Sequence, residues 1–461
     1  MKQRTLLFSV FIGLVVMLII SSCRKHQNEA FVEDQDWLAG GGQTTFIQGN
    51  GAFGQPFQGM TPAQNWLHEI GDKGFEAIFV SAPAPKNSGL GPIFNAVSCA
   101  ACHISDGRGK APEAGEPLQS LLIRVSKAGE DATGGPMEMP LFGGQFQQKA
   151  VAGNVPEGDV SIIYAYQTGL FFDGDSFELR TPTISLINLY QNASDPFLMS
   201  PRIAPPVFGL GLLEAIPEWM LLAKADPTDA NNDGISGRAN YVWDVLLHKT
   251  VLGRFGWKAN TPNLMQQIAA AFNQDMGITN TLFPTESSWG QTQYDQLNDD
   301  VELADSILHA VAFYMRSLAV PARRNVKDPE VIRGQQIFNA IDCAKCHTPK
   351  QKTKVDVVFP AISNQKIFPY TDLLLHDMGA GLADNRPDFL ATGSEWRTPP
   401  LWGIGLTEVV NGHSNFLHDG RARSLLEAIL WHGGEGETSK NKFKQLSKSD
   451  RQAVIKFLKS L

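Results

Sequence analysis

The stretch "IFNAVSCAACH", from Ile93 to His103, returns 244 positions later as "IFNAIDCAKCH", from Ile337 to His347. Each copy ends in Cys-x-x-Cys-His, which is the attachment signature of c-type haem. Two thiols three residues apart can both reach the vinyl groups of one porphyrin, and the histidine after them places an imidazole under the iron as proximal ligand. The sequence therefore predicts two covalently bound c-type haems.

Two other chemistries use paired cysteines, and both fit this spacing less well. A four-cysteine zinc site usually brings together pairs roughly 12 to 20 residues apart, whereas these pairs are 244 residues apart. A thioredoxin-like dithiol does not require a histidine after its second cysteine. The predicted haem residues are Cys99, Cys102 and His103 in the first site, and Cys343, Cys346 and His347 in the second.

Two further blocks repeat in the same order as the haem motifs. "APPVFGLGL" (204–212) matches "TPPLWGIGL" (398–406), and "AVAFYMRSL" (310–318) matches "AVIKFLKSL" (453–461). The last block has the spacing of an amphipathic helix, and Ser447 can cap its start. Three blocks in one order indicate two homologous units. The predicted fold is mainly α, with two tandem cytochrome c-like haem domains, the first enlarged by about a hundred inserted residues.

The N-terminus has the features of an exported protein. Lys2 and Arg4 precede an apolar run, Leu6 to Ile20, which is shorter than the roughly 18 residues of a membrane span and fits a signal peptide. Cys23 follows in a sequence that resembles a bacterial lipobox, where the cysteine carries lipid; an uncleaved anchor helix is the alternative. We expect attachment to a membrane through lipid on Cys23 and a location in the cell envelope, in the periplasm or at the outer membrane.

These observations divide the chain into four parts. We expect a signal peptide at 1–22, a tether and lead-in at 23–60, the first haem domain with its insertions at 61–325, and the second cytochrome c domain at 326–461. The net charge is −8, the pI is about 5.7, and no Lys/Arg-rich run occurs. The basic surface of a nucleic-acid-binding protein is therefore missing, so we expect no nucleic-acid partner.

Several longer motifs accompany the two haem sites. They are "SPRIAPPVFGLGLLEAIPE" (200–218), "DGISGRAN" (233–240), "LGRFGWKAN" (252–260), "DLLLHDMGAGLAD" (372–384), "RTPPLWGIGL" (397–406) and "FLHDGRARSLLEAILWHGGE" (416–435). With them, residues 40–461 resemble the di-haem cytochrome c peroxidase and MauG superfamily. More narrowly, the chain is similar to the di-haem oxidoreductase (putative peroxidase) family of exported bacterial proteins.

The resemblance implies an oxidoreductase with two unequal haems. One haem keeps an open or displaceable sixth position and reacts with hydrogen peroxide or another small oxidant. The other is six-coordinate and passes on electrons from a donor cytochrome or cupredoxin. A pure electron-transfer cytochrome and a MauG-like enzyme that oxidises a protein residue are the alternatives.

The resemblance also implies a distal ligand for the second haem. In the superfamily this ligand follows a His-Asp-Gly turn by about fourteen residues, and counting from His418 gives His432. Leu425, Ile429 and His432 share one helical face, so the imidazole would point where the apolar side chains point. A core histidine without metal is the alternative. The rival ligands in this unit are Met378, His376, His413 and His418.

The first unit has no counterpart of His432 in the sequence. Counting back from its closing block gives Trp289, which cannot ligate iron, and no histidine occurs between His103 and His248. We therefore expect the first haem to be five-coordinate or weakly ligated. The remaining candidates for its sixth ligand are Met137, Met139, Met199 and His248.

Peroxide cleavage needs an acid/base group, for which relatives use a distal glutamate. Glu214 is the predicted catalytic residue and Glu218 the second choice, although Glu214 aligns with Glu408 of the other unit, which favours a shared structural role equally. Trp257 is a candidate electron relay between the haems, with a core tryptophan as the alternative.

A loop in the first unit has the composition of a cation site. Asp229, Asn231 and Asp233 fit the first half of a D-x-N-x-D-G oxygen-ligand loop. The twelfth position is Asn240 rather than Glu, so this is not a complete EF-hand. The superfamily often holds calcium between its haem domains, which implies Ca²⁺ here, while Asp/Asn turns also occur without metal.

Overall fold

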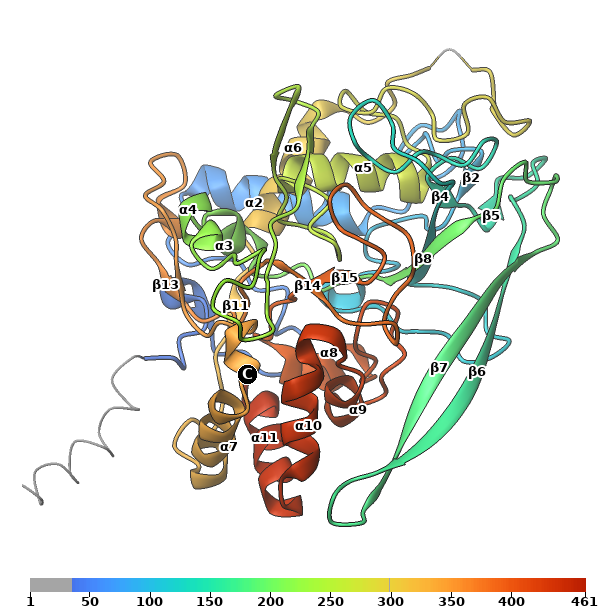
Figure 1. The fold of residues 1–461 in the computed structure, drawn as a ribbon. Helices are drawn as coiled ribbons and strands as arrows, with labels where there is room; N and C mark the ends of the chain where they lie inside the picture. Colours follow the sequence, from blue (N-terminus) through green and yellow to red (C-terminus); the bar gives the residue numbers. More distant parts are fainter. Residues whose placement is uncertain (1–34, 298) are drawn as a thin grey trace, which may run out of the picture.

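The computed structural model describes residues 35–461 except residue 298, so the expected signal peptide and Cys23 lie outside the described residues. Runs of strands and groups of helices follow one another along the chain, with β3 to β8 (121–203) in succession in its first half and α8 to α11 (407–460) at its end (Figure 1). The prediction of a mainly α fold is wrong, because the structure is 27% helical and 19% strand, with short helices and many small sheets. No helix among the described residues is long and apolar enough to cross a membrane.

The helices are α2 (Pro62–Glu76), α3 (Leu210–Glu214), α4 (Glu218–Leu222), α5 (Leu264–Met276), α6 (Asp305–Arg316), α7 (Pro329–Ala340), α8 (Thr407–Asn411), α9 (Leu425–Leu430), α10 (Glu437–Gln445) and α11 (Lys448–Ser460). The longer strands are β3 (Leu121–Ser126), β6 (Asp159–Leu170), β7 (Ser176–Ile187), β8 (Leu198–Ile203), β9 (Tyr241–Asp244) and β10 (Lys249–Leu252). The short strands are β1 (Thr44–Thr45), β2 (Ile93–Phe94), β4 (Gln145–Phe146), β5 (Lys149–Ala150), β11 (Val320–Pro321), β12 (Gln351–Lys352), β13 (Lys366–Ile367), β14 (Leu375–Asp377) and β15 (Glu395–Arg397).

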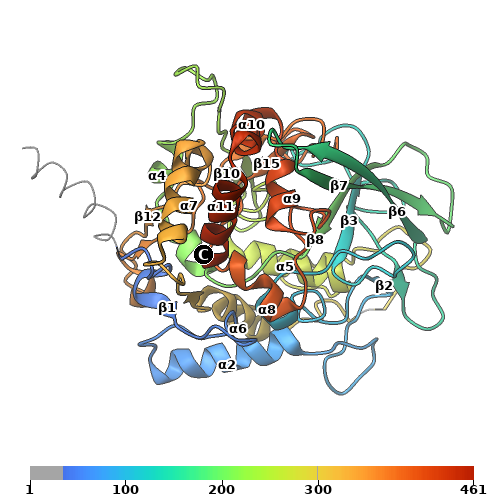
Figure 2. The ribbon, with the colours of Figure 1, turned by 90° about the horizontal axis from the view of Figure 1, so that it is seen from below.

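Two helix pairs form the frame of the molecule. Helix α2 packs against α6, and α7 packs against α11. Figure 2 shows the two pairs on opposite sides of the molecule with α8 between them. In each pair a glycine lies at the crossing: a Cβ on Gly71 would meet the Ala310 carbonyl, and one on Gly334 would meet the Ala453 carbonyl. The two crossings thus use matching positions of the repeated closing block.

Local sequence signals set the ends of these helices. Thr61 and Gln64 form a complete capping box at the start of α2, with Pro62 at the first helical position. At α11 the Ser447 hydroxyl accepts the Asp450 amide hydrogen, as predicted. The predicted apolar face of the closing helix is buried, so this segment forms as expected.

The large insertions of the first unit are the main source of strand. Strand β3 pairs with β4 and β8, and β6 and β7 form a long antiparallel hairpin that lies beside the second unit (Figure 1). Residues 181–187, "TPTISLI", alternate polar and apolar side chains with period two and are rich in β-branched residues, which favours a strand. This alternation explains the excess of strand over the expected cytochrome-like fold.

The repeated "IFNA" stretch adopts two different structures. In the second unit it is the last turn of α7, whereas in the first unit Ile93–Phe94 is strand β2, paired with β5. Pro92 precedes β2 and its ring cannot continue a helix from the preceding turn. The structural match of Phe338 is Phe75 in α2, four residues after the crossing glycine in each unit. The sequence before the haem motifs therefore repeats, but its secondary structure does not.

The described part of the expected lead-in packs against the rest of the protein. Ala39, Ala52 and Phe53 are buried in the largest apolar cluster, and β1 pairs in parallel with β11. A second cluster is built on α7, α9 and α11, and a third lies between β3, β8 and the hairpin. Each predicted haem site lies at the edge of one of the first two clusters.

Candidate functional site: two predicted haem sites

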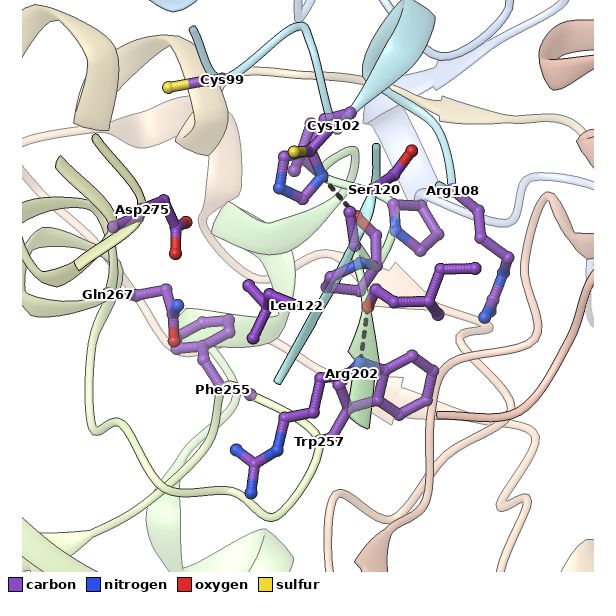
Figure 3. Close-up of a pocket in the computed structure, with 18 of the residues that line it drawn as sticks. Cys99, Cys102, Arg108, Ser120, Leu122, Arg202, Phe255, Trp257, Gln267 and Asp275 are labelled. Carbon is purple, nitrogen blue, oxygen red and sulfur yellow. Dashed lines mark hydrogen bonds between the residues drawn. The ribbon is translucent and has the colours of Figure 1, made fainter. Parts of the chain in front are cut away.

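The first Cys-x-x-Cys-His motif opens onto a cavity whose empty space, together with the open solvent that adjoins it, is about 1830 Å³. Figure 3 shows the sulfur atoms of Cys99 and Cys102 at one end of this cavity and Phe255 and Trp257 at the other. All four cysteines of the two motifs are free of disulfides. The thiols are thus available for attachment to a group that fills the cavity.

Both proximal histidines are held in the orientation that a haem ligand needs. His103 Nδ1 lies 2.7 Å from the Pro205 carbonyl oxygen, and His347 Nδ1 lies 3.2 Å from that of Tyr370. A carbonyl oxygen can only accept, so each Nδ1 carries the hydrogen and each Nε2 keeps a free lone pair. Burial lowers the pKa of both imidazoles to about 4, so both are neutral.

The second site brings the imidazole rings of His347 and His432 close together, with an angle of 52° between their planes. Their ring centroids are 6.4 Å apart, and His432 Nδ1 lies 2.8 Å from the Ala428 carbonyl oxygen, which leaves Nε2 free. Two metal–imidazole bonds of about 2 Å, plus roughly 1.1 Å from each Nε2 to its ring centre, require about 6.2 Å. The pair therefore has the separation that one iron between the two rings would need.

Among the rival ligands, His376 has both ring nitrogens engaged. Nε2 lies 2.9 Å from Asp372 and Nδ1 lies 2.5 Å from Glu435. Burial lowers the pKa of His376, because it disfavours the charged imidazole. The hydrogen bonds to Asp372, to the Cys346 sulfur and to Glu435 outweigh burial, so the pKa lies well above its ordinary value. His376 is thus an imidazolium beside the second site and has no lone pair for iron.

The two other rival histidines are also engaged elsewhere. His413 Nε2 lies 3.0 Å from the Arg108 carbonyl, and His413 Nδ1 accepts the Asn415 amide hydrogen. His418 stacks on Trp396 with ring centroids 3.6 Å apart. Met378 packs against the third apolar cluster. His432 is therefore the histidine that the fold turns toward His347.

The candidates for a sixth ligand in the first site do not line its cavity. Met139 is buried in the third apolar cluster, and Met199 packs against that cluster. His248 is exposed in the turn between β9 and β10. The methionines that do line the cavity are Met276 and Met315. The first site thus presents one imidazole to a large space.

The lining of the first cavity suits a porphyrin. Apolar side chains alternate with four arginines, Arg108, Arg124, Arg202 and Arg397, which can meet carboxylate groups such as haem propionates. Several buried polar atoms of the lining have no hydrogen-bond partner among the described residues: Arg108 Nε, Arg124 Nε, Asn260 Oδ1 and Gln267 Oε1. Unpartnered buried groups are costly, so these atoms indicate a bound polar group in the complete protein.

Glu214 lies outside this cavity. One carboxylate oxygen accepts the Leu264 amide hydrogen at 2.8 Å and the other accepts Arg316 Nε at 2.6 Å. These contacts join the end of α3 to the start of α5 and to α6. The polar side chains of α5 that do line the cavity are Gln267 and Asp275, which sequence reasoning missed. Polar residues interrupting the apolar face of α5 were the signal that could have found them.

The predicted calcium residues lie in one exposed loop whose oxygens bind backbone amides. Asp229 accepts the amide hydrogens of Asp233 and Gly234, and Asn231 also accepts that of Asp233. Lys345 Nζ lies 3.2 Å from the Asp233 carboxylate. No group of three or more His, Cys, Asp or Glu side chains in the described chain is arranged to hold a metal ion. Calcium at this loop therefore stays a prediction.

Trp257 belongs both to the lining of the first cavity and to the third apolar cluster. Its Nε1 donates to the Ile203 carbonyl at 2.8 Å, and its ring lines the first cavity. The same ring belongs to the third apolar cluster with Trp396, and Trp431, the neighbour of His432 in sequence, packs against that cluster. The third apolar cluster thus joins the first cavity to Trp431, the neighbour of His432 in sequence.

Comparison with curated proteins finds no match to this chain, and comparison with solved structures finds none either. A family model described as "Di-haem oxidoreductase, putative peroxidase" matches residues 35–461. The match spans both Cys-x-x-Cys-His motifs, both helix pairs and the first cavity. The chain therefore belongs to the di-haem oxidoreductase family.

Proposed function

We propose that this di-haem oxidoreductase reduces hydrogen peroxide at its first haem with electrons that enter at the second. The observation that carries the proposal is the asymmetry of the two sites. At the second site the ring centroids of two neutral imidazoles lie 6.4 Å apart, while at the first site one imidazole lines a cavity that is open to solvent. A closed site suits electron transfer, and an open site suits a small oxidant.

A c-type haem supplies an iron that exchanges single electrons and can take an external ligand when one axial position is free. The residues of the protein determine which iron transfers electrons and which reacts with peroxide. When the haems are bound, His347 and His432 would both hold the second iron, and His103 would hold the first. Two imidazoles also lower the reduction potential of the second haem relative to His/Met ligation.

The reaction consumes one hydrogen peroxide, two electrons and two protons and yields two waters. The electrons come one at a time from a reduced donor protein, a cytochrome or a cupredoxin. Trp257 and the aromatic side chains of the third cluster lie along the route between the two sites. Glu214 is held by Arg316 and Leu264 and serves this site by positioning α5.

The protein acts outside the cytoplasm. The support is the sequence: a signal-like segment at 1–22, a lipobox-like cysteine at position 23, and two attachment motifs for a cofactor that is joined to protein after export. A lipid on Cys23 would hold the enzyme at a membrane of the cell envelope.

The test is a stopped-flow experiment on the fully reduced, di-haem protein. Mixing with one equivalent of hydrogen peroxide should oxidise both haems, with two electrons removed for each peroxide, while the Soret bands are followed separately. Haem reoxidation no faster than that of free haem at equal concentration would refute the peroxidase proposal. Two low-spin ferric haems without peroxide reactivity would instead indicate an electron-transfer cytochrome.

A further inference from the structure

A turn followed by a helix occurs in both units, at residues 255–271 of the first and 416–432 of the second. Residues 255–263 and 416–424 each form a turn closed by an isolated antiparallel bridge, Phe255 to Thr261 in the first unit and Phe416 to Ala422 in the second. The two bridges span the same number of residues. Residue 255 of the first unit therefore aligns with residue 416 of the second. The repeated sequence blocks do not reveal this alignment.

The backbone of the two turns agrees in detail. Gly256 has φ 77° and its counterpart Leu417 has φ 69°; Ala259 has φ 50° and its counterpart Gly420 has φ 73°. Positive φ is uncommon away from glycine. Two such residues at the same two positions of each turn make a chance match improbable and fix the alignment of the two segments.

Each turn leads into a helix with the same cap. Asn263 caps α5 by accepting the amide hydrogen of Gln266, and Ser424 caps α9 by accepting that of Glu427. In each case the cap stands eight residues after the first bridge residue. Helix α5 is therefore the counterpart of α9, which leads to the distal ligand of the second site.

Counting eight residues past each cap gives His432 in the second unit and Ala271 in the first. This corrects the sequence alignment, which placed Trp289 at that position. Trp289 is 65% exposed, whereas Ala271 lines the first cavity. The residues of α5 that line the cavity are Leu264, Gln267, Ile268, Ala271, Asp275 and Met276.

We propose that Ala271 occupies the distal position of the first haem, where its methyl group leaves space for a small hydrogen-bonding ligand between Gln267 and Asp275. Gln267 and Asp275 lie one helical turn before and one turn after Ala271, so their side chains flank it on the same face. This inference rests on the proposed open first haem and names the ligand class of that site: small peroxide-like molecules.

The two flanking side chains can bind such a ligand. The Gln267 Oε1 atom is buried and has no hydrogen-bond partner among the described residues. Asp275 accepts Gln145 Nε2 at 2.7 Å through one carboxylate oxygen. Figure 3 shows Gln267 and Asp275 on the same side of the cavity, away from Arg108. A peroxide beside Ala271 would therefore meet an amide and a carboxyl group.

The test places an imidazole where the structure lacks one. In the di-haem protein, Ala271→His should convert the first ferric haem from high spin to low spin in the EPR spectrum. Ala270→His is the matched control, because residue 270 follows the same helix but does not line the cavity, and its spectrum should stay that of the wild type. If Ala271→His keeps the high-spin signal, or if the wild type shows none, the inference is wrong.

A second measurement does not depend on the orientation of an introduced histidine side chain. Free imidazole should bind the first haem of the wild type, and Ala271→Leu should weaken this binding at least tenfold, while Ala270→Leu leaves it unchanged. Equal affinities in all three proteins would overturn the inference. A low-spin Ala271→His protein together with a wild type inert to peroxide would support the distal position and refute the peroxidase function, so the two failures are distinguishable.

Discussion

At the residue scale, three imidazoles of this protein make the same kind of hydrogen bond to the backbone. His103, His347 and His432 each turn Nδ1 toward a backbone carbonyl oxygen, at 2.7, 3.2 and 2.8 Å. The carbonyl fixes the tautomer and the ring orientation, so each Nε2 lone pair has one direction in which to bind iron. Burial keeps the rings neutral at neutral pH, since it lowers their pKa values.

Removing one of these imidazoles should change the spin state and the reduction potential of one haem. In His432→Ala the second iron should lose its sixth ligand, turn from low spin to high spin and rise in reduction potential. His413→Ala is the matched control, because both nitrogens of that ring are bonded elsewhere. Ferric EPR and a redox titration measure both effects. A low-spin second haem that survives in His432→Ala would show that another group is its ligand.

The sequence singles out these three histidines as candidate ligands, but it does not predict their surroundings. Cys-x-x-Cys-His is local, and His432 follows its turn at a fixed count. The carbonyl partner of His103 belongs to Pro205, 102 residues away, and no local pattern marks it. Glu214 was chosen by resemblance, yet its contacts with Arg316 and Leu264 depend on how α3, α5 and α6 meet. Sequence motifs and their spacing do not predict tertiary contacts of this kind.

At the scale of elements, the two helix crossings explain why the closing block repeats. Each proximal histidine has a phenylalanine of the first helix beside it, Phe75 at 6.1 Å from His103 and Phe338 at 6.3 Å from His347, between ring centroids. The glycine one turn earlier lets the second helix approach closely. Amphipathic periodicity predicted the closing helix correctly. The strands were missed because their alternating pattern lies in inserted segments that the repeat does not cover.

A methyl group at the crossing should separate α7 from α11. In Gly334→Ala the new Cβ would meet backbone of residue 453, which cannot move like a flexible side chain, so we expect the free energy of unfolding to fall by about 1–3 kcal/mol. Gln336→Ala, on the exposed side of the same helix, should stay within about 0.5 kcal/mol of the wild type. Denaturant unfolding of the di-haem protein measures both. Equal stability of the two variants would contradict a close crossing.

On the scale of the whole molecule, the insertion of the first unit supports the second. Arg180 of β7 is fully buried, and its guanidinium donates to the carbonyl oxygens of Arg421 and Gly420 in the turn before α9. Its backbone amide donates to Glu427 of α9 at 2.8 Å. The hairpin therefore holds the turn and the helix that lead to His432, which links the two units through more than their haems.

This coupling makes a testable prediction about the second haem. Arg180→Leu leaves two buried carbonyl oxygens without their donor, which should lower stability by about 2 kcal/mol. Because those carbonyls belong to the turn before α9, His432 should also be held less firmly, and part of the second haem should become high spin. Lys448→Ala is the control: it removes an exposed ion pair to Asp175 at the hairpin tip, and such pairs contribute little. Thermal unfolding and ferric EPR separate the two effects, and an Arg180→Leu protein with an unchanged second-haem spectrum would show that the hairpin stabilises the fold without positioning the ligand.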